Sequence, residues 1–137
     1  MTRTRNRLQQ EAGAVGWLII VWLTVVVMIG VVLMDVGSIA FTKFRLADVA
    51  SSASTQAANA YRTSRDLAAA CQAAVDQIAT EDPEARLAVQ GCSVDVQTGV
   101  ATIKVRKQAS TMVAGRLDFT KHYTKVTATE SNGPSTL

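Results

Sequence analysis

The longest uniform stretch of the chain is an unbroken apolar run from Ala14 to Met34. As an α-helix these 21 residues would rise about 30 Å, which is the thickness of the hydrocarbon core of a bilayer. Apart from two tryptophans, the only polar side chain in the run is Thr24, whose hydroxyl can bond its own helix backbone, and the first charge after the run is Asp35. The pattern therefore predicts a transmembrane helix, which we place at residues 14–36.

A short basic leader, residues 1–13, precedes this run. It holds three arginines and one acid, Glu11. Because cytoplasmic flanks of membrane helices are rich in Lys and Arg, we expect a single-pass protein of the cytoplasmic membrane, with its N-terminus inside and its C-terminal part extracytoplasmic. A cleaved secretory signal is the alternative, since Ser38-Ile39-Ala40 resembles a cleavage site. The apolar run, however, is longer than the roughly 7 to 15 residues of an ordinary signal core.

Helical periodicity continues beyond the apolar run. Between Asp35 and Tyr61 there is no proline, and small residues recur at spacings of three, four and seven. Small side chains allow a second helix to approach closely. The alternative is that alanine is abundant here only because it favours helix. The residues of this candidate helix-packing seam are Gly30, Gly37, Ala47, Ala50, Ser54 and Ala57.

The rest of the chain predicts one short helix followed by strands. Capping residues at 63–66 precede apolar residues at helical spacing, and Asp82-Pro83 ends that segment. Residues 87–96 and 101–106 alternate in polarity around a turn at 97–99, a pattern typical of a β-hairpin. A third strand is expected at 120–129, and residues 131–137 are expected to form a disordered tail.

Three short strands present one apolar face that must be covered. The second half of the long helix and the short second helix are the available covers. The expected fold class is therefore α+β: a long N-terminal helix, with its first half in the membrane, packs on a small three-stranded antiparallel sheet, and a short second helix completes the domain. We expect this extracytoplasmic domain to span residues 37–130.

The two cysteines lie on surfaces that should face each other. Cys71 falls on the apolar stripe of the second helix, and Cys92 falls on the inward side of the first strand. An oxidising compartment and a small core favour a disulfide between them, and two buried free thiols are the alternative. No Cys-x-x-Cys motif or Cys/His cluster with the spacing of metal ligands occurs, so we expect no metal and no cofactor.

Charge and motif content argue against several function classes. The net charge is +3, divided between the two sides of the apolar run, so a nucleic-acid partner is not expected. His122 is the only histidine, and no glycine-rich phosphate loop is present. We therefore do not expect an enzyme.

A basic cluster is expected on the outward side of the sheet. Lys104 and Arg106 would lie on the second strand, beside Tyr123 and Lys125 of the third. This is a candidate basic contact face for an acidic polymer or for the acidic face of a partner. An ordinary solvated surface is the alternative.

Three segments of the first sixty residues follow one another in a recognisable order. They are Glu11-Ala12-Gly13-Ala14-Val15 before the run, Met34-Asp35-Val36-Gly37 at its end, and Arg45-Leu46-Ala47-Asp48-Val49-Ala50 with Ala57-Ala58-Asn59-Ala60 after it. Together they resemble TadE/TadG-like proteins of the tight-adherence (Flp-type) pilus system. The resemblance implies a pilin-like fold and a minor pilin-like subunit or accessory envelope protein of such a pilus, or of a related secretion assembly. Its partners would be pilins or other membrane proteins of that assembly.

The same resemblance implies a prepilin peptidase as a partner, cutting between Gly13 and Ala14. Pilin-like members commonly carry Glu five residues beyond the cleaved glycine, and Leu18 occupies that position here. This difference favours slow or absent cleavage and a permanently anchored accessory subunit. The alternative function is a stand-alone membrane-anchored extracellular binding module that uses the basic face.

Overall fold

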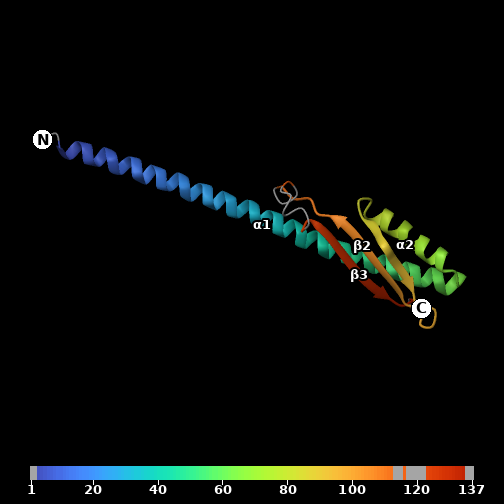
Figure 1. The fold of residues 1–137 in the computed structure, drawn as a ribbon. Coiled ribbons are helices and arrows are strands. Elements are labelled where there is room, and N and C mark those ends of the chain that lie inside the picture. The colour runs from blue at the N-terminus through green and yellow to red at the C-terminus, as the bar shows by residue number, and fades with distance from the viewer. Residues whose placement is uncertain (1–2, 113–115, 117–122, 135–137) are drawn as a thin grey trace.

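The computed structural model describes residues 3–112, 116 and 123–134, with side chains from residue 15 onward. The architecture is α+β, as expected, and Figure 1 shows α1 as a long rod that carries the rest of the domain on its C-terminal half. The elements in chain order are α1 (Arg3–Ser64), α2 (Leu67–Glu81), β1 (Arg86–Val94), β2 (Ala101–Gln108) and β3 (Lys125–Asn132).

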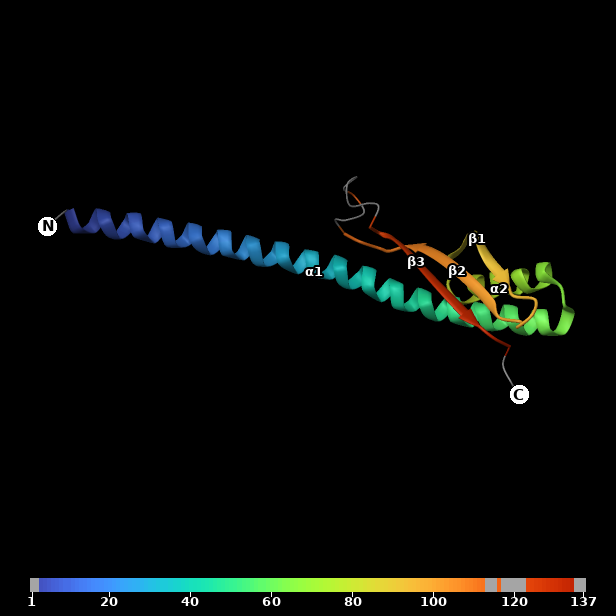
Figure 2. The same cartoon turned by 60° about the horizontal axis from the view of Figure 1, so that its bottom comes forward.

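Helix α1 is continuous over 62 residues. Its first half is long and apolar enough to cross a membrane, and its apolar side chains are exposed there. The hydroxyl of Thr24 donates to the carbonyl of Ile20 at 2.8 Å, so this polar group is satisfied within the helix. In Figure 2 this half extends away from the domain without touching the sheet.

A tight reversal joins the two helices. Arg65 has a positive φ of 57°, and its N–H donates to the carbonyl of Tyr61 at 2.8 Å. Asp66 then caps α2 by accepting the N–H of Ala68 at 2.8 Å. Alanines on both helices are fully buried in the shared core, so the two backbones lie close together. These alanines are Ala50, Ala53, Ala57 and Ala58 of α1 and Ala70 and Ala74 of α2.

The antiparallel sheet has the order β1-β2-β3. The inward side chains of β2, among them Ile103 and Val105, are fully buried against the helices, whereas the outward ones are exposed. Both helices pack on the inner face, and no other described helix or strand covers the opposite face (Figure 2). The predicted hairpin is confirmed, with β1 ending at Val94.

Strand β1 contains a large bulge that its sequence pattern did not predict. Leu87 pairs with Val105 and Cys92 with Ile103, so residues 88–91 of β1 oppose Lys104 alone. A Cβ atom at Gly91 would lie 2.6 Å from the carbonyl oxygen of Lys104. Only glycine fits this close approach of two backbones.

The third strand differs from the expectation at both ends. It begins at Lys125, after a turn at Tyr123 and Thr124, and it continues to Asn132. The predicted residues 120–122 and the last residues of the chain, 135–137, lie outside the described ranges. The expectation of a disordered tail from residue 131 is wrong for Ser131 and Asn132, because both are paired with β2.

A side-chain contact explains why the end of β3 is ordered. The amide nitrogen Nδ2 of Asn132 donates to the hydroxyl of Ser54 at 2.7 Å and to the carbonyl of Ser51 at 3.1 Å. Ser54 is fully buried on α1, so its hydroxyl needs a partner inside the protein. These hydrogen bonds hold the end of β3 against α1.

Candidate functional surfaces

The predicted disulfide is present. Cys71 of α2 and Cys92 of β1 are bonded, with 5.9 Å between their Cα atoms and 21 positions between them in sequence. The bond links α2 to β1 directly after the bulge, where the β1–β2 register resumes. The bond therefore holds α2 and β1 together.

The structure divides the candidate helix-packing seam into two parts. Ala50, Ser54 and Ala57 are fully buried under the protein's own domain, and Ala47 is half-buried. This part of α1 packs on α2 and on the sheet of the same chain, and Ser54 accepts a hydrogen bond from Asn132 of β3. The continuous seam expected from the sequence is therefore not found.

The two glycines of that seam lie on another side of α1. A Cβ atom added at Gly30 or Gly37 would meet nothing within 4 Å. At about 100° per residue, Gly37 and Ala57 point about 160° apart around the helix. The glycines therefore face away from the domain and remain available to a neighbour.

The four residues of the basic contact face lie on or beside the outward side of the sheet. Lys104 and Arg106 project from β2 and Lys125 from β3, and all three are exposed. Tyr123 is 72% exposed in the turn before β3. None of the three cations has an ion pair in the described part of the chain.

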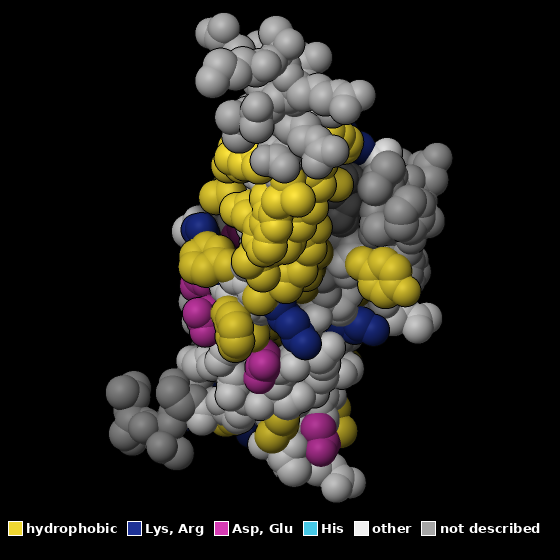
Figure 3. All heavy atoms as spheres, turned by 90° about the vertical axis from the view of Figure 1, so that its left-hand side faces the viewer, with side chains coloured by type: hydrophobic (Ala, Val, Ile, Leu, Met, Phe, Trp, Pro, Cys, Tyr) yellow, Lys and Arg dark blue, Asp and Glu magenta, His cyan; other side chains and the backbone are white. Residues whose placement is uncertain are grey.

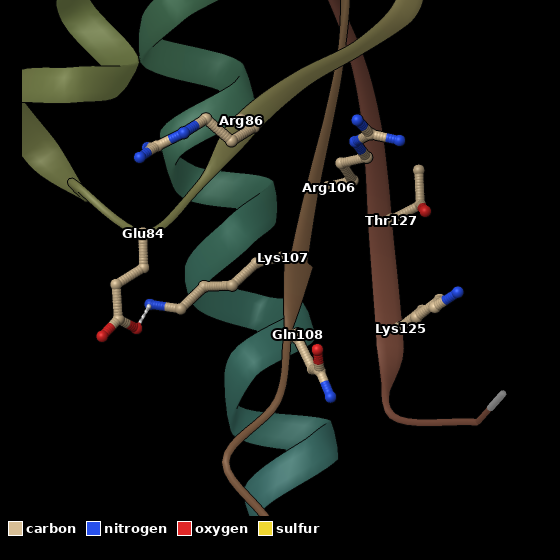
Figure 4. A pocket seen from close by; sticks show the side chains of 7 residues that line it. All are labelled: Glu84, Arg86, Arg106, Lys107, Gln108, Lys125 and Thr127. Carbon is tan, nitrogen blue, oxygen red and sulfur yellow. Dashed lines mark ion pairs between the residues drawn. The ribbon is translucent and has the colours of Figure 1, made fainter. Parts of the chain in front are cut away.

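The structure adds Arg86 to this face. Arg86 is the register partner of Arg106 across β1 and β2. The guanidinium of Arg86 turns toward α2, where Nη1 donates to the carbonyls of Pro83 and, at 2.8 Å, Ala85 (Figure 4). The sequence prediction missed Arg86 because it began the strand at Leu87. An open groove here is lined by Glu84, Arg86, Arg106, Lys107, Gln108, Lys125 and Thr127.

Lys107 lies in the same groove but is neutralised. Its ammonium group lies 2.7 Å from Oδ2 of Asp82 and 3.1 Å from Oε2 of Glu84, the contact drawn in Figure 4. Burial opposes the charged form of Asp82. The hydrogen bonds from Lys107 and from the N–H of Glu84, together with the attraction of Lys107, outweigh this and lower the pKa of Asp82. The hydrogen bond to Asp82 raises the pKa of Lys107.

Asp35 has a structural role that the sequence did not reveal. This residue is only 7% exposed, and its Oδ1 accepts the N–H of Met112 at 2.7 Å. One turn further along α1, the hydroxyl of Ser38 donates to the carbonyl of Ser110. These contacts attach the segment after β2 to α1 at the point where the apolar run ends.

The described residues contain no group of three or more His, Cys, Asp or Glu side chains that could hold a metal ion. His122 lies outside the described ranges. Gly13 and Ala14 lie within the backbone of α1, which continues through them without interruption.

Comparisons with known proteins give no relative for this chain. No family model matches it, and no curated protein or solved structure is significantly similar to it.

Proposed function

We propose that this protein is a minor pilin-like subunit, or a permanently anchored accessory protein, of a Tad/Flp-type pilus or a related secretion assembly. It spans the cytoplasmic membrane once, with its N-terminus inside, and it acts by helix association and not by catalysis. One observation carries the proposal: α1 passes from an exposed apolar half into the domain without a break, so the apolar segment and the domain share one helix.

The exposed side of α1 supports helix association. Gly30, Gly37 and Phe44 fall within about 40° of one another around the helix, on the side away from the domain. Both glycines leave open space, and Phe44 is 75% exposed. In lipid, helices gain no free energy from burying apolar surface, so they associate through close van der Waals contact, which small residues permit. A neighbouring subunit could therefore pack along this side both within the membrane and above it.

The first experiment places a photo-crosslinking phenylalanine analogue at Phe44 in the full-length protein. We expect it to crosslink to a pilin or to a membrane protein of the pilus assembly, identified by mass spectrometry. The matched control carries the same analogue at Val96, an exposed position in the hairpin turn. The absence of such crosslinks from position 44 in membrane-inserted protein, or crosslinks from position 96 as strong as those from position 44, would contradict the proposal.

Processing by a prepilin peptidase is a separate part of the proposal. Leu18 lacks the carboxylate that would pair with a new N-terminal amine of a neighbouring subunit, and in lipid such a charged contact would matter because water is absent. We therefore expect cleavage after Gly13 to be slow or absent. N-terminal sequencing of the membrane-bound protein decides this, because Ala14 as the first residue would indicate a processed, filament-type subunit.

A second candidate function is that of an anchored binding module that uses the basic face. The exposed cations Lys104, Arg106 and Lys125 favour it, because they lie on one side of the sheet without an ion pair in the described part of the chain. Charge reversal at Arg106 should then weaken retention on an immobilised sulfated polysaccharide, and more so at low salt. Reversal at Arg45, an exposed arginine of α1, is the matched control. Equal retention of both variants would exclude this function.

A further inference from the structure

The segment that follows β2 is fixed to α1 at one level along the helix. The Met112 N–H bonds to Asp35, and the Ser110 carbonyl bonds to Ser38. The base of the same loop is closed by the N–H of Ala109, which donates to the carbonyl of Thr124 at 2.8 Å. The position of Met112 along the axis of α1 is therefore that of Asp35.

Asp35 marks the boundary of the apolar run. It is the first charged residue after Met34, and the exposed apolar side chains of α1 continue up to it. In a membrane, a carboxylate at this place lies at the junction between the hydrocarbon core and the headgroups. Because its N–H bonds to Asp35, Met112 then lies at the same depth in the membrane, beside α1.

We infer that residues 109–112, the described start of the loop after β2 and called the loop below, rest in the outer interface of the bilayer that α1 spans, with the side chain of Met112 inserted among the lipids. This inference rests on the membrane anchor of the proposed function. Met112 is 64% exposed although it is apolar, and the lipid surface would cover it. Two points of attachment, α1 and the loop, would fix the orientation of the domain relative to the membrane.

The surroundings of the loop fit a lipid interface. Tyr123, in the turn before β3, is exposed, and tyrosine is enriched where membrane meets water. Lys125, two residues after Tyr123, and Lys43, eight residues after Asp35 on α1, are exposed and could reach lipid phosphates. In Figure 3, which views the molecule from the N-terminal end of α1, hydrophobic side chains and charged side chains of both signs lie around the apolar rod on the side that would face the bilayer.

The inserted position can be tested in the full-length protein, reconstituted in vesicles of phosphatidylcholine and phosphatidylglycerol. Single cysteines at Val27, Met112 or Gln97 carry a fluorescent nitrobenzoxadiazole label, since both native cysteines are bonded to each other. Lipids with a spin label at a shallow or deep acyl position serve as quenchers. We expect deep quenching at position 27, shallow quenching with a blue-shifted emission at position 112, and several-fold weaker quenching at position 97, in the hairpin turn.

Each outcome separates the loop from the anchor. Quenching at position 112 no stronger than at position 97, with position 27 deeply quenched, would overturn the inference and leave the anchor intact. Weak quenching at position 27 would show that α1 does not span the bilayer, which would contradict the membrane anchor of the proposed function.

The role of Asp35 in holding the loop is tested in the same assay. Asp35→Ala should reduce quenching at position 112 severalfold without changing position 27. Asp48→Ala, which changes an exposed acid on α1, should leave both unchanged. Unchanged quenching at position 112 in Asp35→Ala would overturn the assignment of Asp35 as the residue that positions the loop.

Discussion

The ammonium group of Lys107 lies within 2.9 Å of both carboxylate oxygens of Asp82. This contact joins β2 to the C-terminal end of α2, because Asp82 is also the C-cap residue of that helix. The Asp82 side chain is almost fully buried, whereas that of Lys107 is partly accessible. The pair therefore connects the second helix to the sheet at the end opposite the helix reversal.

Asp82→Asn should lower the free energy of unfolding by about 1–3 kcal/mol at neutral pH, because the buried carboxylate charge beside Lys107 and one of its two accepting oxygens are lost. The pKa of Asp82 is lowered in the fold, so its contribution is present above its unfolded pKa and is lost as pH falls through the folded value. Denaturation of the wild-type and variant proteins in detergent, between neutral and strongly acidic pH, measures both effects. We expect the gap between the two proteins to close at acidic pH.

Glu84→Gln is the matched control for this prediction. Its carboxylate also contacts Lys107, but its side chain is 80% exposed, and exposed ion pairs contribute little. A loss of stability equal to that of Asp82→Asn would show that burial is not the reason for the strength of the Asp82 contact.

Removal of the disulfide should destabilise the domain without unfolding α1. A bond that closes a loop of this length contributes roughly 3 kcal/mol in the chain-entropy model. The double variant Cys71→Ser, Cys92→Ser should therefore be more easily digested within α2 and β1, which limited proteolysis with mass spectrometry can map. Unchanged protection of these two elements would mean that the packed alanines alone hold α2 in place.

The predicted disulfide and both helices were accessible from the sequence because they depend on local patterns. Asp66 as a cap, the apolar spacing of α2 and the absence of proline before Tyr61 act over a few residues. The inward position of Cys92 followed from simple alternation, and its partner Cys71 from the helical period. The α+β class then followed, since only the helices could cover the sheet.

Long-range contacts explain what the sequence did not predict. Asp35 and Met112 are 77 positions apart, and nothing in either local pattern indicates that they meet. The end of β3 is ordered by Asn132, which reaches Ser54 across α1. Helical spacing predicts a single helix-packing seam, because it does not say which side of the helix the sheet will cover. In the structure Gly37 and Ala57 lie on different sides of α1.

Gly91→Ala adds only one methyl group, but it should lower the free energy of unfolding of the domain strongly. The new methyl group would lie 2.6 Å from the carbonyl oxygen of Lys104 and 2.7 Å from that of Ala88, and neither backbone group can move without disturbing the bulge. Overpacking of this kind typically costs about 1–3 kcal/mol. Gly133→Ala, where the methyl group meets nothing within 4 Å, is the control and should leave the unfolding midpoint unchanged. Equal stability of the two variants would show that the bulge is adaptable.

Two leucine substitutions on α1 distinguish assembly from folding. Gly30→Leu adds a side chain to the open face within the apolar run, so the span stays apolar and the domain is not disturbed. Because helix association in lipid needs close approach, this variant should lose crosslinks to its neighbours. Ala57→Leu instead adds volume to a fully buried position, and it should destabilise the domain by about 1–3 kcal/mol.

The two variants are compared for crosslinking from position 44, for membrane insertion and for formation of the Cys71–Cys92 bond. We expect Gly30→Leu to insert, to form the disulfide and to lose its crosslinks to pilus-assembly proteins. Ala57→Leu should insert but form the disulfide less completely, because a larger side chain at this fully buried position displaces the elements packed on α1. If Gly30→Leu keeps every crosslink, the glycine face is not a contact between subunits, and the binding module that uses the basic face becomes the better account of the protein.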